Sequence, residues 1–293
     1  MIGSFTGIFD GSNYGISRLY INKGDIDQYT YAHCGFWGVS DFAEIGNLKV
    51  YDSFVSCNGR LVGTLVGYSW YTTISSINIE GVVYGESSTG GIIGETGHTY
   101  ITQSSFVGTL KADYQAGGLV GYLWASVLSE SYAEINIDLM DWSVHPWRYQ
   151  IGGLVGYVEW STVESSFVIG TVRGVRHLGG VAGTVLTDEG YFPIANIKNC
   201  WSDVEVIRVE SSTSDAIGSL IGENYKSPIT NSYSTGRIIY EDAPDPTDKG
   251  FIGEQDTGGN WADKNNFFDM ETSLQTSTTG NATGKVTADM KNF

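Results

Sequence analysis

A short glycine-containing phrase recurs along almost the whole chain, and this repetition constrains the fold more than any other feature. It reads GFWG at 35–38, GTLVG at 63–67, GGIIG at 90–94, GGLVG at 117–121 and 152–156, GGVAG at 179–183, GSLIG at 218–222 and GFIG at 250–253. The closing glycines are Gly38, Gly67, Gly94, Gly121, Gly156, Gly183, Gly222 and Gly253. Their spacings of 29, 27, 27, 35, 27, 39 and 31 residues indicate a unit of about 27 residues that accepts insertions.

A second phrase follows most copies of the first and pairs a small residue with an aromatic one. Its copies are Ser105–Phe106, Ser131–Tyr132, Ser166–Phe167, Cys200–Trp201 and Ser232–Tyr233, whereas Ile77–Asn78 departs from the rule. Both phrases are short, rich in Val, Ile, Thr, Ser and aromatic residues, and bounded by turn-forming residues, which is typical of strands. We find no convincing helical spacing of apolar residues.

Short strands repeating at this interval predict an all-β fold, a single parallel β-solenoid, because each coil buries its apolar side only against its neighbours. About eight to nine coils, stacked about 4.8 Å apart, would form a rod about 40 Å long. Loops are expected to bulge at 139–147, 187–193, 210–216 and 241–248. We expect the glycine columns to let the backbone turn tightly in every coil. A propeller blade would need a longer repeat of about 40–50 residues.

Charge narrows the choice of partners. The chain carries 33 acidic and 16 basic side chains, a net charge of −17, so a phosphate backbone or an anionic membrane surface would repel it. The sequence has no apolar run of about 18 residues that would indicate a transmembrane helix, and no visible signal peptide. We therefore expect neither a nucleic-acid partner nor insertion into a membrane.

The three cysteines have no spacing typical of a zinc site or a disulfide framework. Cys34 and Cys57 lie 23 residues apart, close to one coil length, so their pairing is an open possibility. Cys200 occupies the position that serine fills in the other copies of the second phrase. We expect Cys200 to be a small buried residue rather than a reactive thiol.

The phrase GGLVGY, followed by VESSFVIGTV or ITNSYSTGRI, resembles the GLUG repeat of large bacterial and archaeal surface or secreted proteins. Residues 5–21 look like the phrase that opens such arrays, and residues 265–291 are similar to the phrase that closes them. The resemblance implies a right-handed β-helix-like domain over 1–293, with an opening cap and first coil at 1–33, repeats at 34–264 and a closing segment at 265–293. We also expect the chain to be a domain from a longer protein.

The resemblance further implies a non-catalytic extracellular module that serves as an adhesin segment, a stalk or a structural surface element. Immunoglobulin-A-cleaving metallopeptidases that carry such repeats use a separate zinc domain with an H-E-x-x-H helix, a motif that this sequence lacks. The expected partners are glycans or a cell-surface protein. Two alternatives stay open. One is a subunit of a self-assembling extracellular filament. The other is a polysaccharide-active β-helix enzyme, although basic residues to hold an acidic substrate are scarce.

Aromatic residues that follow the glycine phrases are the candidate ligand-binding positions. In a solenoid they would form a column down one side, where their apolar surfaces suit the C–H groups of a sugar ring, and the insertion at 139–147 adds two tryptophans. The competing interpretation is a stacked ladder that stabilises the rod. The candidates are Tyr68, Trp70, Tyr122, Trp124, Trp142, Trp147, Tyr157 and Trp160.

Acidic residues give weaker candidates. The stretch YEDAPDPTDKG at 240–250 concentrates Glu241, Asp242, Asp245 and Asp248, and calcium prefers clustered oxygen ligands. No EF-hand spacing is present, so a solvated acidic loop is the favoured interpretation. A weak calcium site stays open as the alternative, and no other cofactor is expected. For Asp269 and Glu271, in the closing segment, we expect a capping role rather than catalysis.

Overall fold

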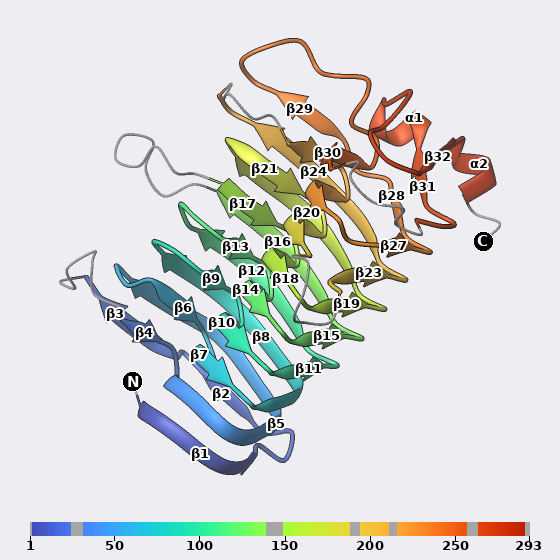
Figure 1. Ribbon diagram of the computed structural model, residues 1–293. Helices are drawn as coiled ribbons and strands as arrows, with labels where there is room; N and C mark the ends of the chain where they lie inside the picture. The colour runs from blue at the N-terminus through green and yellow to red at the C-terminus, as the bar shows by residue number, and fades with distance from the viewer. Residues whose placement is uncertain are drawn as a thin grey trace.

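The computed structural model of the protein describes residues 2–24, 32–138, 149–187, 194–210, 216–256 and 263–290. In these ranges the chain is nearly all β and winds into a stack of parallel coils, with the first coil at one end and two short helices at the other (Figure 1). The fold is a parallel β-solenoid, as the repeat predicts. Each coil contributes strands to three faces of one large sheet and to a second, smaller sheet.

The strands of the first face begin one residue before the closing glycine of each phrase. The parallel neighbours on this face are nine strands of the described residues, in agreement with the predicted number of coils. They are β1 (Ile2–Asp10), β5 (Trp37–Cys57), β7 (Val66–Trp70), β10 (Ile93–Gly97), β14 (Val120–Trp124), β18 (Val155–Glu159), β22 (Ala182–Leu186), β26 (Ile221–Tyr225) and β30 (Ile252–Gln255).

The second face is narrow, and its strands pair with the later part of β5 or with one another. Its members are β8 (Thr73–Gly85), β11 (Tyr100–Thr102), β15 (Val127–Ser129), β19 (Thr162–Glu164), β23 (Asn196–Lys198) and β27 (Ile229–Thr230). β5 and β8 are long because they continue around the corner onto the third face.

The third face holds the second phrase of the repeat and extends from the first coil to the closing segment. Its other strands are β2 (Gly15–Ser17), β3 (Tyr20–Lys23), β12 (Ser105–Lys111), β16 (Tyr132–Asp138), β20 (Phe167–Gly174), β24 (Trp201–Arg208), β28 (Tyr233–Ser234), β29 (Ile238–Tyr240), β31 (Phe267–Asp269) and β32 (Thr283–Lys285).

The smaller sheet is built from the residues that precede each tight glycine turn. Its strands are β4 (His33–Cys34), β6 (Leu61–Gly63), β9 (Thr89–Gly90), β13 (Ala116–Gly117), β17 (Tyr149–Gly152), β21 (Arg176–Gly179) and β25 (Ile217–Gly218). The end of β4 is also joined covalently to the end of β5, because Cys34 is disulfide-bonded to Cys57. The pairing that the sequence left open is therefore present in the structure.

We expected the closing glycines to let the backbone turn tightly in every coil, and this expectation is wrong about why glycine is required. None of the described closing glycines is among the residues with positive φ. A Cβ built on Gly121 would instead lie 2.4 Å from the backbone carbon of Ser88 and 2.5 Å from the nitrogen of Thr89 in the smaller sheet. A Cβ on Gly156 or Gly183, in the next two coils, would meet the equivalent backbone atoms of the smaller sheet. The glycine column exists because two sheets touch there through bare backbone.

The turns between the faces use residues other than glycine in the left-handed conformation. The corner after the first face is occupied by Tyr71, His98, Ala125, Trp160 and Lys226, and the corner after the second face by Asn47, Ser76, Gln103, Glu130, Ser165, Asn199, Asn231 and Asn265. Asparagine tolerates this conformation better than most residues, which explains its repetition in the last coils. A buried hydroxyl supports many of these corners from inside, as where Ser126 Oγ accepts a 2.9 Å hydrogen bond from the backbone N–H of Thr99.

The interior is a continuous apolar column that needs every coil. Leu119, Leu154, Val181 and Leu220, from the middle of the glycine phrase, are fully buried and lie on successive levels of the stack. Cys200 is buried as well, so the prediction that it is a small buried residue is confirmed, and burial raises the pKa of its thiol to about 12. Strands flanking the predicted loops keep their register, as in the pairing of Ile137 with Val172. The loops at 139–147 and 188–193, and most of 210–216, lie outside the described residues.

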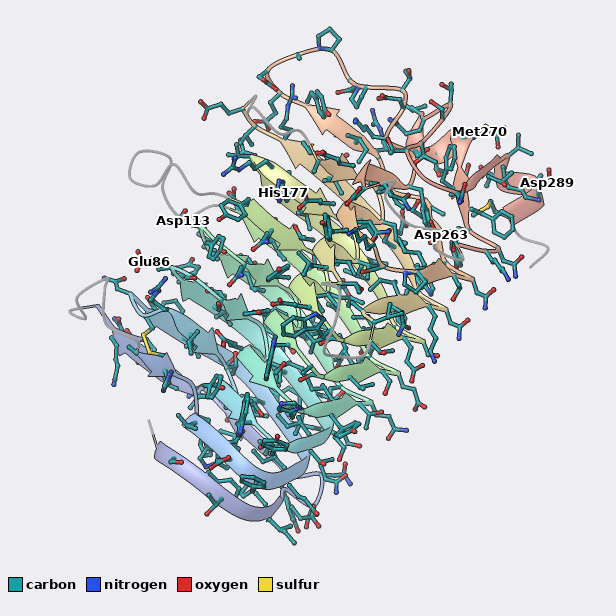
Figure 2. All side chains as sticks on the ribbon, viewed as in Figure 1. Glu86, Asp113, His177, Asp263, Met270 and Asp289 are labelled. Carbon is teal, nitrogen blue, oxygen red and sulfur yellow. A yellow bond between two sulfur atoms is a disulfide. The ribbon has the colours of Figure 1, made fainter. Side chains whose placement is uncertain are left out.

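The closing segment covers the last coil. Asp269 caps helix α1 (Met270–Ser273), where its side chain accepts hydrogen bonds from the backbone N–H groups of Glu271 and Thr272. Glu271 in turn accepts from the backbone N–H of Thr287, the first residue of α2 (Thr287–Met290). The predicted capping role of both carboxylates is confirmed. Asp263, Met270 and Asp289 lie around this end of the molecule (Figure 2).

Candidate functional site: aromatic ladders on the outer faces

The predicted aromatic column lies on the outside of the first face, but it is two interrupted rows rather than one. In the first row the register runs from Tyr68 through Glu95 to Tyr122 and Tyr157. In the second row Trp70 is followed by Gly97 and then by Trp124. Trp160 belongs to neither row, because it occupies the left-handed corner beside them. Trp142 and Trp147 lie outside the described residues.

The rings of these rows pack on one another. Trp70 and Trp124 stack with centroids 5.4 Å apart and planes within 9° of parallel, although a whole coil separates them. Gly97 makes this possible, since a Cβ there would lie 2.1 Å from the Trp70 ring. His98 meets both tryptophans edge-on at 5.0 and 4.9 Å. These ring surfaces are largely covered by neighbours, which is the arrangement expected of a stabilising ladder.

The first row also holds an ionisable group that the repeat phrases did not reveal. Glu95 is half-buried between the levels of Tyr68 and Tyr122, and burial raises the pKa of its carboxyl to about 7, with the positive charge of Arg60 opposing the shift. One coil further, the hydroxyl of Tyr122 donates a hydrogen bond to Glu159. Counting 27 residues back from Tyr122 would have located Glu95 from the sequence.

A further polar group lies where the same outer row meets the smaller sheet. His177 Nδ1 lies 3.2 Å from a carboxylate oxygen of Glu223, and burial lowers the pKa of His177 to about 4. Burial, with the charge of Glu254 adding to it, raises the pKa of Glu223. Glu223 and Glu254 face a hollow of about 360 Å³ together with Asp256. Among the described residues, no group of three or more His, Cys, Asp or Glu side chains is placed to hold a metal ion.

The carboxylates of the acidic loop at 241–248 do not point toward one common site. Glu241 accepts a 2.6 Å hydrogen bond from Arg173, and Asp242 accepts one of 2.9 Å from the buried Arg208. Asp245 accepts from the backbone N–H of Tyr240, while Asp248 is exposed. Because each of the first three turns toward a different donor, the loop as described offers no common set of oxygen ligands.

A second aromatic ladder lies on the third face, and the repeat did contain its signal. Tyr132, Phe167, Trp201 and Tyr233 stack in register with centroid separations of 5.1, 4.6 and 5.9 Å and planes within 5° of parallel. The pair Ser105–Phe106, however, was aligned one residue out of register. The structure pairs Ser105, and not Phe106, with Tyr132, and Phe106 is fully buried beneath Gly91. Tyr132 and Tyr233, the two ends of this second ladder, are each 37% exposed.

Asparagines at the adjoining corner form a parallel row, here called the asparagine ladder. Asn231 Nδ2 donates to Asn199 Oδ1 at 3.2 Å, and Asn265 Nδ2 donates to Asn231 Oδ1 at 3.0 Å. All three residues occupy equivalent left-handed corners of successive coils. The asparagine ladder therefore runs beside the C-terminal half of the second aromatic ladder. No prediction from the sequence included it.

A search of protein-family models finds no match to the chain, and a search of curated proteins finds none either. Within the described part of the chain, no helix is both long enough and apolar enough to cross a membrane.

Proposed function

We propose that the chain is a non-catalytic extracellular β-solenoid module of the GLUG-repeat type that serves as an adhesin segment, a stalk or a structural surface element. The observation that carries this proposal is the uninterrupted coil stack, in which the ladder of the first face runs in parallel register from β1 to β30. A body held together by such ladders keeps its two ends at a fixed distance of about 40 Å.

The disulfide between Cys34 and Cys57 supports the extracellular assignment. Disulfides form and persist mainly in oxidising compartments, whereas cytosolic thiols stay reduced. The net charge of −17 is compatible with a soluble surface that approaches neutral or cationic partners. The outer aromatic rows support a structural role as well, since their rings stack mainly on one another.

The second candidate function is polysaccharide cleavage, and the hollow beside Glu223 and Glu254 is the observation that favours it. Retaining and inverting glycosidases both use two carboxyl groups on either side of the bond. Here Glu223 is engaged by His177 at 3.2 Å and by Thr184 at 3.4 Å, which ties it into the surface network. We therefore rank this candidate second.

Incubation with a panel of neutral and acidic polysaccharides separates the two functions. If the chain is a non-catalytic module, neither the wild type nor Glu223→Gln will release new reducing ends or unsaturated products. Cleavage by the wild type that disappears in Glu223→Gln would replace the proposal with the enzyme.

Filament assembly is tested by sedimentation velocity across a wide concentration range. Head-to-tail stacking of coils needs a free strand edge at both ends, whereas α1, β32 and α2 cover the last coil. We expect a mass near 31.8 kDa throughout. A series of growing oligomers would contradict the module and favour the filament.

A further inference from the structure

A hollow of about 440 Å³ lies where the second aromatic ladder reaches the closing segment. This volume is within the usual range of small-molecule sites, about 300–1,000 Å³. Its lining residues are Asn231, Ser232, Tyr233, Asn265, Phe267 and Met290. None of these side chains carries a charge at neutral pH, although the chain as a whole has a net charge of −17. The hollow is therefore suited to an uncharged ligand.

Apolar contacts line part of the hollow. Within the second ladder, Phe167 and Trp201 have ring partners on both sides, so their faces are covered. Tyr233 is the last ring of that stack, and Trp201 is its ring partner at 5.9 Å. The next residue in register is Phe267, which lines the same hollow and has the ammonium of Lys285 4.9 Å from its ring centroid. Tyr233, which is 37% exposed, thus offers aromatic surface to a ligand with C–H groups.

The asparagine ladder brings polar groups to the same hollow. Its hydrogen bonds run from Asn265 through Asn231 to Asn199, so each amide donates toward the N-terminal end of the stack. The side-chain carbonyl oxygen of Asn265 is then left as an acceptor at the end of this hydrogen-bonded row. Each amide also retains a second N–H.

We propose that this hollow binds a pyranose unit of a neutral glycan. The C–H groups of the sugar pack against Tyr233, Phe267 and Met290, and its adjacent hydroxyls pair with the amides of Asn265 and Asn231. A hydroxyl both donates and accepts, as an amide does, whereas a purely apolar ligand would leave these amides unpaired. An acidic sugar is disfavoured by the field of the protein.

A neighbouring hollow extends the site. It has a volume of about 400 Å³ and shares Asn265 and Phe267 with the first. Asp263, Asn281 and Thr283 contribute further polar groups, and the carboxyl of Asp263 also disfavours an acidic sugar. Two hollows on either side of one asparagine and one aromatic residue fit two consecutive sugar units. The ligand is therefore an oligosaccharide rather than a free monosaccharide, and this inference rests on the proposed role as an extracellular module.

The test is binding of the full, disulfide-intact chain to an array of neutral oligosaccharides, followed by titration of the best ligand against two pairs of variants. Tyr233→Ala removes the ring at the hollow, whereas Tyr132→Ala removes the equally exposed ring at the far end of the same ladder. Asn265→Gly removes an amide at the hollow, and Asn199→Gly removes one two coils away. Glycine keeps the left-handed corner of both asparagines, with φ values of 57° and 53°.

We expect Tyr233→Ala and Asn265→Gly each to weaken binding about tenfold, and both distant variants to change it less than about twofold. Thermal unfolding of all four variants shows which of them retain the fold, and Asn265→Gly decides the matter if Tyr233→Ala does not fold. Equal effects of the near and distant variants, or no neutral glycan bound by wild type, would overturn the site. The proposed module would survive that result, because its mass and its lack of cleavage are measured separately.

Discussion

Alanine at a closing glycine gives the sharpest test of how the repeat works. Gly121 has no positive φ, so alanine fits its backbone conformation. If the glycine served only to make the chain flexible, Gly121→Ala would be neutral or would stabilise the protein by about 0.4–1 kcal/mol. The structure predicts instead that Gly121→Ala lowers the free energy of unfolding. The new Cβ would lie within 2.4–2.6 Å of Ser88 C, Thr89 N and Gly94 O, all of them backbone atoms held by sheet hydrogen bonds.

Overpacking a tight interior costs about 1–3 kcal/mol, and backbone neighbours cannot rotate away as side chains do. We therefore expect Gly121→Ala to lose about 3 kcal/mol of unfolding free energy, measured by urea denaturation. Gly3→Ala is the matched control, because a Cβ on Gly3 meets nothing within 4 Å. It should change stability by less than about 0.5 kcal/mol. Unchanged or increased stability in Gly121→Ala would refute the close-contact explanation.

Three further predictions follow from particular side chains. The pKa of Glu95 is raised from 4.5 to about 7 in the folded state, so ionising it opposes folding: stability should fall by up to about 3 kcal/mol between pH 4.5 and 7, and Glu95→Gln should flatten that pH profile in urea titrations. Cys34→Ser with Cys57→Ser opens a 23-residue loop and should cost about 3 kcal/mol, and an unchanged denaturation midpoint would contradict this. Cys200 should stay unreactive toward a thiol reagent until the protein unfolds, because it is buried with a pKa of about 12; rapid labelling of the native protein would show otherwise.

The periodicity of the sequence was sufficient for the fold, the 27-residue unit and the approximate number of coils. Each closing glycine recurs at the level where a coil ends, so register could be read directly from spacing. The cause of that column could not, since the contact between Gly121 and Thr89 joins two sheets whose mutual approach appears in no local pattern. The same limit explains the phrase pair Ser105–Phe106. Two serines stand side by side there, and only the stacking of coils shows that Ser104 Oγ supports the corner.

The candidate site was predictable in kind but not in place. Aromatic residues following the glycines drew attention to Trp70 and Trp124, whose rings the structure stacks together over Gly97. The hollow at Tyr233 depends on the closing segment, because Met290 of α2 lies far along the sequence from Asn231. Asparagine at three corners could have been noticed at intervals of 32 and 34 residues, but its hydrogen-bonded row required the coil geometry.

The cellular location of the protein tests most directly the central claim, that the chain is an extracellular module. An antibody raised against the purified, disulfide-intact chain would be applied to intact cells of the organism that encodes it, with a second sample permeabilised as the control. The account predicts equal staining of both samples, or recovery of the protein from the medium. Staining that appears only after permeabilisation would place the chain inside the cell and contradict the extracellular module.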